Sequence, residues 1–232
     1  MTLSEAEWAA LLLSLKVSVW ATICTLPIAL WVAWLLARKA FWGKGVLNAA
    51  VHLPLVLPPV VTGYLLLIGF GRNGPIGQGL HDWFGITLAF RWTGAALAAG
   101  IMGFPLVVRA IRLAIEAVDP KLEQAAATSG ASRISVFLRV TLPLIVPGVL
   151  AGAIMGFAKA MGEFGATITF VANIPGQTQT LPSAVYAFLQ VPGEEHAAFR
   201  LVVLALIVAL GAVALSEWLA RRVARKIAGQ DA

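Results

Sequence analysis

The sequence predicts an all-α integral membrane protein with about five transmembrane helices. Of its 232 residues, 59% are hydrophobic and only 12% are charged, and the mean hydropathy is +0.87. A soluble domain of this length carries about twice that charged fraction. The basic residues gather at the ends of the hydrophobic runs, so a membrane accounts for the formal charge of +6 without a nucleic-acid partner. We therefore expect a single transmembrane domain over residues 1–232.

The first two expected spans differ in proline content. The first runs from about 8 to 36 and is long enough to cross a bilayer with some tilt. The second, about 46 to 70, contains Pro54, Pro58 and Pro59, which lack N–H donors and leave helix carbonyls without partners. Such breaks are tolerated in a membrane where protein or water covers them, so this span is expected to be packed or pore-lining. Residues 69–91 are expected to form a loop.

The third and fourth spans flank a polar segment. The third is expected from about 92 to 108, with a helical extension toward residue 118, and the fourth begins near Leu142. In the fourth, Gly148, Gly152 and Gly156 recur every four residues and form one small-residue face. Such a face permits close helix contact in membranes. The contact is expected with another helix of the same chain, although a second copy is the alternative.

The region after the fourth span has two interpretations. Lys159 and Glu163 are four residues apart and can pair, and an ionisable residue at membrane depth is by default a candidate functional residue. The alternative is that the pair ends the helix at the outer surface. Residues 173–196 are expected to form an outer loop with a short amphipathic helix around 183–189, and whether residues 160–195 line the gate or form an outer loop stays open. The last span is expected from about 197 to 219.

The distribution of basic residues predicts the orientation. Twelve of the 17 Lys and Arg residues fall in the first basic loop, the 109–139 region and the C-terminal tail. Basic residues near span ends are enriched on the cytoplasmic side. Five spans with the N-terminus outside and the C-terminus in the cytoplasm therefore fit best.

The polar segment from residue 119 to 140 predicts two short helices joined at a glycine. Asp119 can cap the first helix, and Pro120 suits its first position. Gly130 is expected to end that helix in a left-handed conformation, and Ser132 is placed to cap the second. The pattern therefore predicts two cytoplasmic helices beside the membrane.

This segment resembles the EAA motif of ABC-importer permeases, in which Glu-Ala-Ala precedes a glycine and a later Leu-Pro. Gln124 replaces the glutamate of the motif, and Glu123 lies one residue earlier. The resemblance implies that the segment docks into a cleft on a separate ATPase subunit. The residues to which it assigns this coupling are Asp119, Glu123, Gln124, Ala125, Ala126, Gly130, Leu142 and Pro143.

Most of the chain also resembles the permeases of molybdate ABC importers. The matching stretches include HLPLVLPPVVTGYLLL from residue 52, GEFGATITFV from residue 162 and NIPGQTQTLPSA from residue 173. The resemblance implies the type I importer permease fold in a bacterial inner membrane. It also implies a homodimer, two ATP-binding subunits, a periplasmic binding protein for molybdate or tungstate, and a pore gate that contains Glu163, Phe164 and Gly165.

Two other classes of function are alternatives to an importer permease. A secondary transporter or channel not driven by ATP is the main alternative, but no internal repeat is visible in the sequence. A membrane-embedded enzyme would need a nucleophile–base or metal constellation, and one cysteine with three scattered histidines offers none. No GxxxxGK[ST] motif occurs either. We therefore expect no catalytic residues, metal or cofactor in this chain, with ATP hydrolysis in another subunit.

Overall fold

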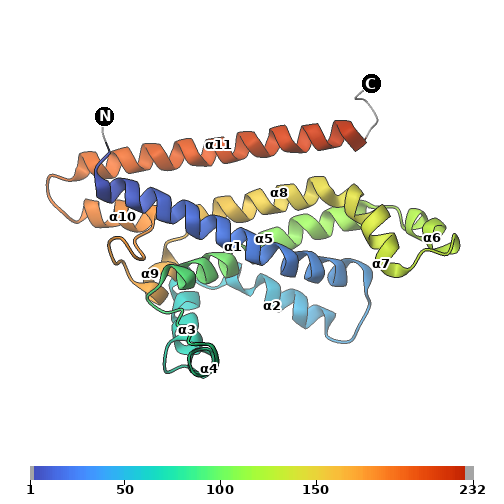
Figure 1. The fold of residues 1–232 in the computed structure, drawn as a ribbon, viewed down its shortest axis with the longest axis horizontal. Helices are drawn as coiled ribbons and strands as arrows, with labels where there is room; N and C mark the ends of the chain where they lie inside the picture. The colour runs from blue at the N-terminus through green and yellow to red at the C-terminus, as the bar shows by residue number, and fades with distance from the viewer. Residues whose placement is uncertain (1–2, 228–232) are drawn as a thin grey trace.

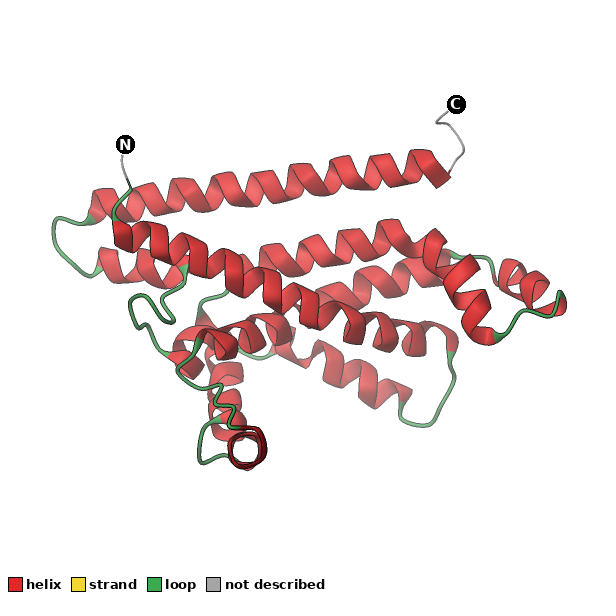
Figure 2. Ribbon diagram, in the orientation of Figure 1, coloured by secondary structure: helices red, strands yellow, loops and turns green. Residues whose placement is uncertain are grey.

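The structure, a computed structural model, describes residues 3–227, which fold into helices and loops without a strand (Figure 2). The elements are α1 Glu5–Arg38, α2 Lys44–Val56, α3 Pro59–Phe70, α4 Pro75–Phe84, α5 Trp92–Ala117, α6 Pro120–Thr128, α7 Arg133–Val136, the π-helical turn η1 Phe137–Thr141, α8 Leu142–Met161, α9 Gly165–Val171, α10 Leu181–Leu189 and α11 Glu195–Ile227.

The centre of the bundle is α5, which packs against both α1 and α8 (Figure 1). Small residues make this packing close, since Ala95, Ala98 and Ala99 on α5 are fully buried. Toward the α6 end, larger apolar side chains such as Ile111 and Ile115 fill the core. The long helix α11 lies beside α8 and α10 and leaves much of its apolar surface exposed, as expected for a face toward lipid.

The described residues contain four helical segments long and apolar enough to cross a membrane, and a bent fifth one. The fifth consists of α2 and α3, which meet at an angle of 115° where Leu57 and Pro58 leave helical geometry. The expected fold class and number of spans are confirmed, and the proline-rich span is indeed broken. Figure 1 shows that α3 leaves the bundle almost at right angles to the long helices.

Two predicted boundaries were wrong. Residues 69–91 are not only a loop, because α4 forms there with Pro75 at its first turn and Gly85 in a left-handed conformation at its end. The fourth span does not begin at Leu142: helix runs without interruption from Arg133 to Met161 through the π-helical turn. The second short helix of the polar segment is therefore the first part of the fourth span.

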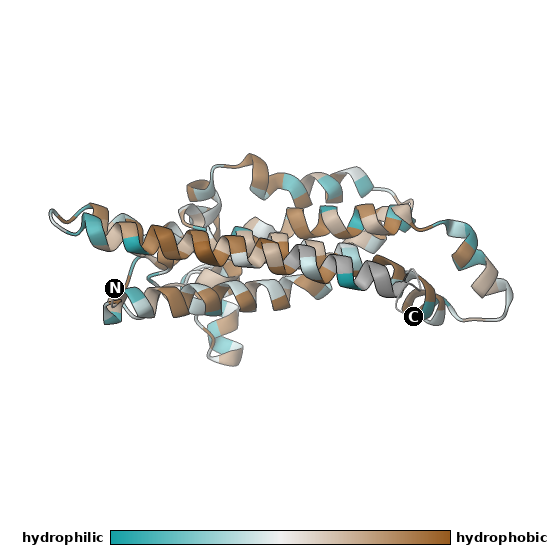
Figure 3. Ribbon diagram, turned by 90° about the horizontal axis from the view of Figure 1, so that it is seen from above, coloured by the Kyte–Doolittle hydropathy of each residue, from teal (hydrophilic) through white to brown (hydrophobic). Residues whose placement is uncertain are grey.

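The region after α8 was also predicted incompletely. Within the stretch 160–195, for which the sequence left a gate or an outer loop open, residues 165–171 form the helix α9, in which Phe170 and Val171 are fully buried. The short helix α10 begins at Leu181, two residues before the expected start. Figure 3 shows apolar residues along the middle of the long helices and polar residues near the ends, and α6 extends beyond the apolar part.

Candidate functional site

The α6 segment has the local geometry that its sequence predicts. The Asp119 carboxylate accepts a hydrogen bond from the Lys121 N–H at 2.9 Å, and Pro120 begins the helix. Gly130 has φ +88°, where a residue with a side chain is strained. The Ser132 hydroxyl accepts from the Ser135 N–H at 3.3 Å and caps α7. The chain therefore reverses at Gly130 between α6 and the long helix that begins with α7.

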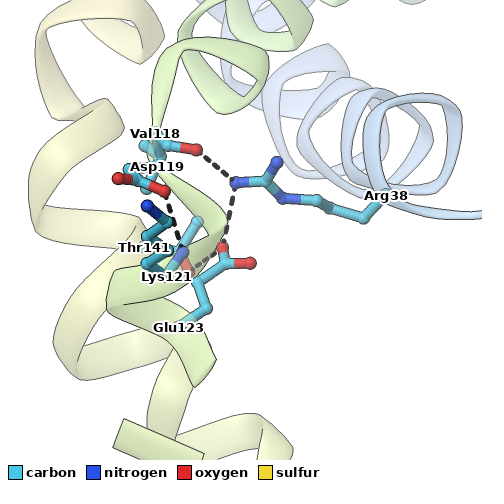
Figure 4. Close-up of polar contacts among 6 residues, drawn as sticks. All are labelled: Arg38, Val118, Asp119, Lys121, Glu123 and Thr141. Carbon is cyan, nitrogen blue, oxygen red and sulfur yellow. Dashed lines mark hydrogen bonds and ion pairs between the residues drawn. The ribbon is translucent and has the colours of Figure 1, made fainter. Parts of the chain in front are cut away.

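One arginine connects this segment to the membrane bundle. The Arg38 guanidinium, at the end of α1, donates to the Val118 carbonyl at 3.0 Å and to the Glu123 carboxylate at 3.2 Å (Figure 4). The same Glu123 oxygen accepts from the Thr141 hydroxyl at 2.7 Å. The Glu123 carboxylate thereby joins α6 to the end of α1 and to the turn η1, and Arg38 also holds the end of α5.

The other predicted coupling residues fall into two groups. Gln124 and Ala125 are exposed on α6 and Ala126 is half-buried, in a helix that has no fully buried residue. The described chain therefore leaves most of the α6 surface uncovered. Leu142 and Pro143 lie at the start of α8, where Leu142 packs against the core of the bundle. These two residues are apart from the exposed surface of α6.

Neither Arg38 nor Thr141 was singled out from the sequence as a functional residue. Arg38 lies 85 positions before Glu123, and Thr141 lies 18 positions after it. A basic residue at a span end is ordinary, so no local pattern distinguishes Arg38. The only available signal was the position of Glu123 inside the matched motif.

The predicted gate residues lie in the break between α8 and α9. Glu163 is only 2% exposed, and its carboxylate accepts from the Lys159 ammonium at 2.7 Å and from the Ala166 N–H at 3.0 Å. The Glu163 carboxylate is therefore buried and paired beside the first turn of α9. Phe164 and Tyr186 on α10 have ring centroids 5.3 Å apart.

Glycines let α3 cross α9 closely. A Cβ added at Gly165 would lie 2.7 Å from the Pro59 Cβ, and one added at Gly63 would lie 2.5 Å from the Ala166 carbonyl oxygen. No side chain fits at either position without a shift of backbone or proline ring. The broken span α2–α3 and the Glu163–Phe164–Gly165 break are thus in direct contact.

The glycine face of α8 contacts α5 of the same chain. A Cβ at Gly148 would lie 2.2 Å from the Ala114 Cβ, and one at Gly156 would lie 2.7 Å from a Val107 methyl group. A Cβ added at Gly152 would lie 3.2 Å from the Val107 carbonyl oxygen. These glycines set the distance between the two central helices of the bundle.

At the opposite end of the bundle from α6, an ion pair that the sequence did not predict joins α1 to α11. Arg200 on α11 donates to the fully buried Glu7 carboxylate at 2.8 Å. Nearby, the buried Ser14 hydroxyl accepts from the Leu181 N–H at 2.6 Å and holds the start of α10 against α1. Residues 3–227 contain no group of acidic, cysteine or histidine side chains able to hold a metal ion.

Comparison with known proteins identifies the class. The fold matches that of a bacterial alginate ABC transporter, solved with its alginate pentasaccharide-bound periplasmic protein, at a TM-score of 0.74 and 18% identity over 95% of this chain and 80% of that chain. A family described as "Binding-protein-dependent transport system inner membrane component" matches residues 25–229, and the chain belongs to this family.

Two relatives are much more similar in sequence. The molybdenum transport system permease protein ModB of Escherichia coli strain K12 is 57% identical over 230 residues, which cover 99% of this chain and all of that protein. The ModB protein of Haemophilus influenzae is 56% identical over 221 residues, covering 95% and 96% of the two chains. The predicted membrane-permease class is confirmed, and the chain is a multi-pass inner-membrane component of a transport system that depends on a binding protein.

Proposed function

We propose that this chain is the permease of an ATP-driven molybdate importer, which also accepts tungstate or a related oxyanion. The observation that carries the proposal is the α6 segment, an exposed helix that Glu123 joins to α1 and to η1, at the membrane face where basic residues gather. An ordinary loop helix has no reason to be bonded to two spans through one carboxylate. The substrate class is supported by the two molybdenum permeases that match nearly the whole chain.

The assembly contains two copies of the permease, two ATP-binding subunits and one periplasmic molybdate-binding protein. Each copy is a single transmembrane domain over residues 1–232, with the N-terminus outside and the C-terminus in the cytoplasm. This orientation places α6 on the cytoplasmic side, where the ATPase subunits lie, in agreement with the bias in basic residues. In α3, five large apolar side chains, among them Tyr64 and Leu65, are 40% exposed or more, which suits contact with a second copy.

The exposed residues Gln124 and Ala125, with the half-buried Ala126, enter the ATPase cleft, and Asp119 and Gly130 set the direction of the helix that carries them. When the ATPase subunits close on ATP, α6 moves and pulls on α1 through Arg38 and on α8 through Thr141. Because the Gly148–Gly152–Gly156 face holds α8 against α5, these helices turn together. The break at Glu163–Phe164–Gly165, which contacts α3, then opens or closes as a two-state gate.

In this proposal the permease holds no fixed cationic site for the oxyanion along the pathway. At the gate the Lys159 ammonium is paired with Glu163, so it is not available as a separate anion ligand. Selection by the binding protein and gating by the permease account for this arrangement.

The test is uptake of molybdate into proteoliposomes that contain the permease, its ATPase and the loaded binding protein, with tungstate and sulfate as competitors. We expect accumulation that requires both ATP and the binding protein and that tungstate competes for. Uptake that persists without the ATPase would instead favour a secondary transporter or channel. Uptake of sulfate in preference to molybdate would retain the importer class and refute the substrate.

A further inference from the structure

An apolar groove of about 610 Å³ lies along α1 and α5, on the side where α2 covers only part of them. Its walls are almost entirely apolar, with Trp20 and Trp92 at one end and Ile28, Pro54 and Phe104 toward the other. The bend of 115° between α2 and α3 explains the groove, because it turns the second half of this span away from α1 and α5. Beyond the end of α2, the residues that line the groove belong to α1 and α5 alone.

The groove has the length of one membrane leaflet. Lys16 precedes Arg38 by 22 residues, or about 33 Å along α1, while the hydrocarbon core is about 30 Å thick. With Arg38 at the membrane face nearest α6, Lys16 therefore lies at the opposite headgroup boundary. On α5 the residues that line the groove run from Trp92 to Phe104, which is about 18 Å by the same rise and slightly more than half of the hydrocarbon core. The groove thus begins at headgroup depth and ends just beyond the middle of the bilayer.

The headgroup end of the groove is positively charged and aromatic. The Lys16 ammonium lies 3.8 Å from the centre of the Trp92 ring, and the Trp20 and Trp92 ring centroids are 6.4 Å apart. Lys16 is exposed, and among residues 3–227 no carboxylate pairs with it. Arg91 precedes Trp92 and is also exposed. Tryptophan and lysine are the side chains that favour the lipid headgroup region.

From these features we propose that the groove is a binding site for an anionic phospholipid of the leaflet farther from α6. Its acyl chain lies between α1 and α5 and fills the space left by the bend of α2, while its phosphate contacts Lys16. Two features favour a lipid over a helix of a second copy. The groove has the length of one leaflet, and the Lys16 ammonium, which no carboxylate pairs among residues 3–227, lies at its headgroup end. This site is additional to the transport pathway and does not depend on the identity of the transported anion.

The proposal is tested by native mass spectrometry of the delipidated complex after addition of phosphatidylglycerol or phosphatidylcholine. Wild type should retain phosphatidylglycerol in preference. Lys16→Gln should reduce that retention about fivefold, the factor expected for one cation acting on anionic lipid at a membrane surface. Ala96→Trp, which fills the groove, should remove the retained lipid of both kinds. The matched control, Arg72→Gln, removes an exposed charge away from the groove and should retain lipid as wild type does.

A second measurement does not depend on how well the groove-filling variant folds. A photoreactive p-benzoylphenylalanine in place of Leu97, which lines the groove, should form adducts with the mass of a phospholipid. An adduct heavier by a whole chain of 24.5 kDa would show that a second copy occupies the groove and would overturn the proposal. Unchanged phosphatidylglycerol retention in Lys16→Gln and Ala96→Trp would overturn it as well.

Discussion

Replacing Glu123 with alanine should release α6 from the membrane bundle. The substitution leaves the Thr141 hydroxyl, which is 1% exposed, without its partner, and the Arg38 guanidinium without its carboxylate. An orphaned buried polar group costs about 1–3 kcal/mol. The Arg38 and Glu123 side chains are 17% and 23% exposed, so the larger cost of breaking a fully buried ion pair does not apply. We expect a loss of about 2 kcal/mol, which corresponds to about a thirtyfold change in an equilibrium constant.

Hydrogen exchange of the α6 amides in the purified complex measures this change. Glu123→Ala should raise the opening equilibrium of residues 120–128 by about thirtyfold, and Glu123→Gln should have a smaller effect because an acceptor oxygen remains for Thr141. The matched control is Glu116→Ala, which also removes one carboxylate, from a pair that is 30% and 40% exposed. Exposed pairs contribute about 0.2–1 kcal/mol, so the control should change exchange in α6 very little. Equal α6 protection in wild type and Glu123→Ala would refute the anchoring role of Glu123.

Three further predictions concern the rest of the chain. Gly148→Ala should destabilise the complex by about 1–3 kcal/mol, because the added methyl group overlaps Ala114. Gly211→Ala is the control, since Gly211 has open space around it, and it should not change stability. Equal melting temperatures of the two variants would contradict the close packing of α8 on α5. Glu163→Gln should change basal ATPase activity while the complex still assembles, since it weakens the pair with Lys159, and unchanged ATPase and transport would remove Glu163 from the gate. In a variant without the native cysteine, Gly43→Cys should react only with reagents that reach the cytoplasm and Gly79→Cys only from outside; labelling of position 79 from the cytoplasm would refute the orientation.

Local backbone chemistry was predictable from the sequence. Pro58 and Pro59 predicted the break in the second span, and Asp119 and Gly130 predicted the start and end of α6. Each of these features depends on a single residue type with a strong backbone preference. The number of spans followed from run length and hydropathy for the same kind of reason.

Features that depend on tertiary packing were not predictable in this way. The break at Gly162 lies between Lys159 and Glu163, whose spacing of four residues favours a continuous helix, so the sequence pattern did not separate α9 from α8. The bonds from Arg38 to Glu123 and from Arg200 to Glu7 join residues 85 and 193 positions apart. Neither pair follows a local spacing rule. The burial of Glu163 was missed because counting residues along the fourth span placed the Lys159–Glu163 pair near the outer interface, whereas Glu163 is buried in the break between α8 and α9.

The most direct test of the coupling role is the ATP hydrolysis of the purified complex with and without loaded binding protein. Gly130→Val places a β-branched residue at φ +88°, a strain of about 1–2 kcal/mol that should redirect α6 and leave the spans intact. Ala126→Asp places a charge on the face of α6 that we propose enters an apolar cleft of the ATPase. In both variants hydrolysis should stop responding to the binding protein or the ATPase should no longer co-purify, while Ser135→Ala should respond as wild type does. Stimulated hydrolysis in both Gly130→Val and Ala126→Asp would contradict the assignment of α6 as the coupling element.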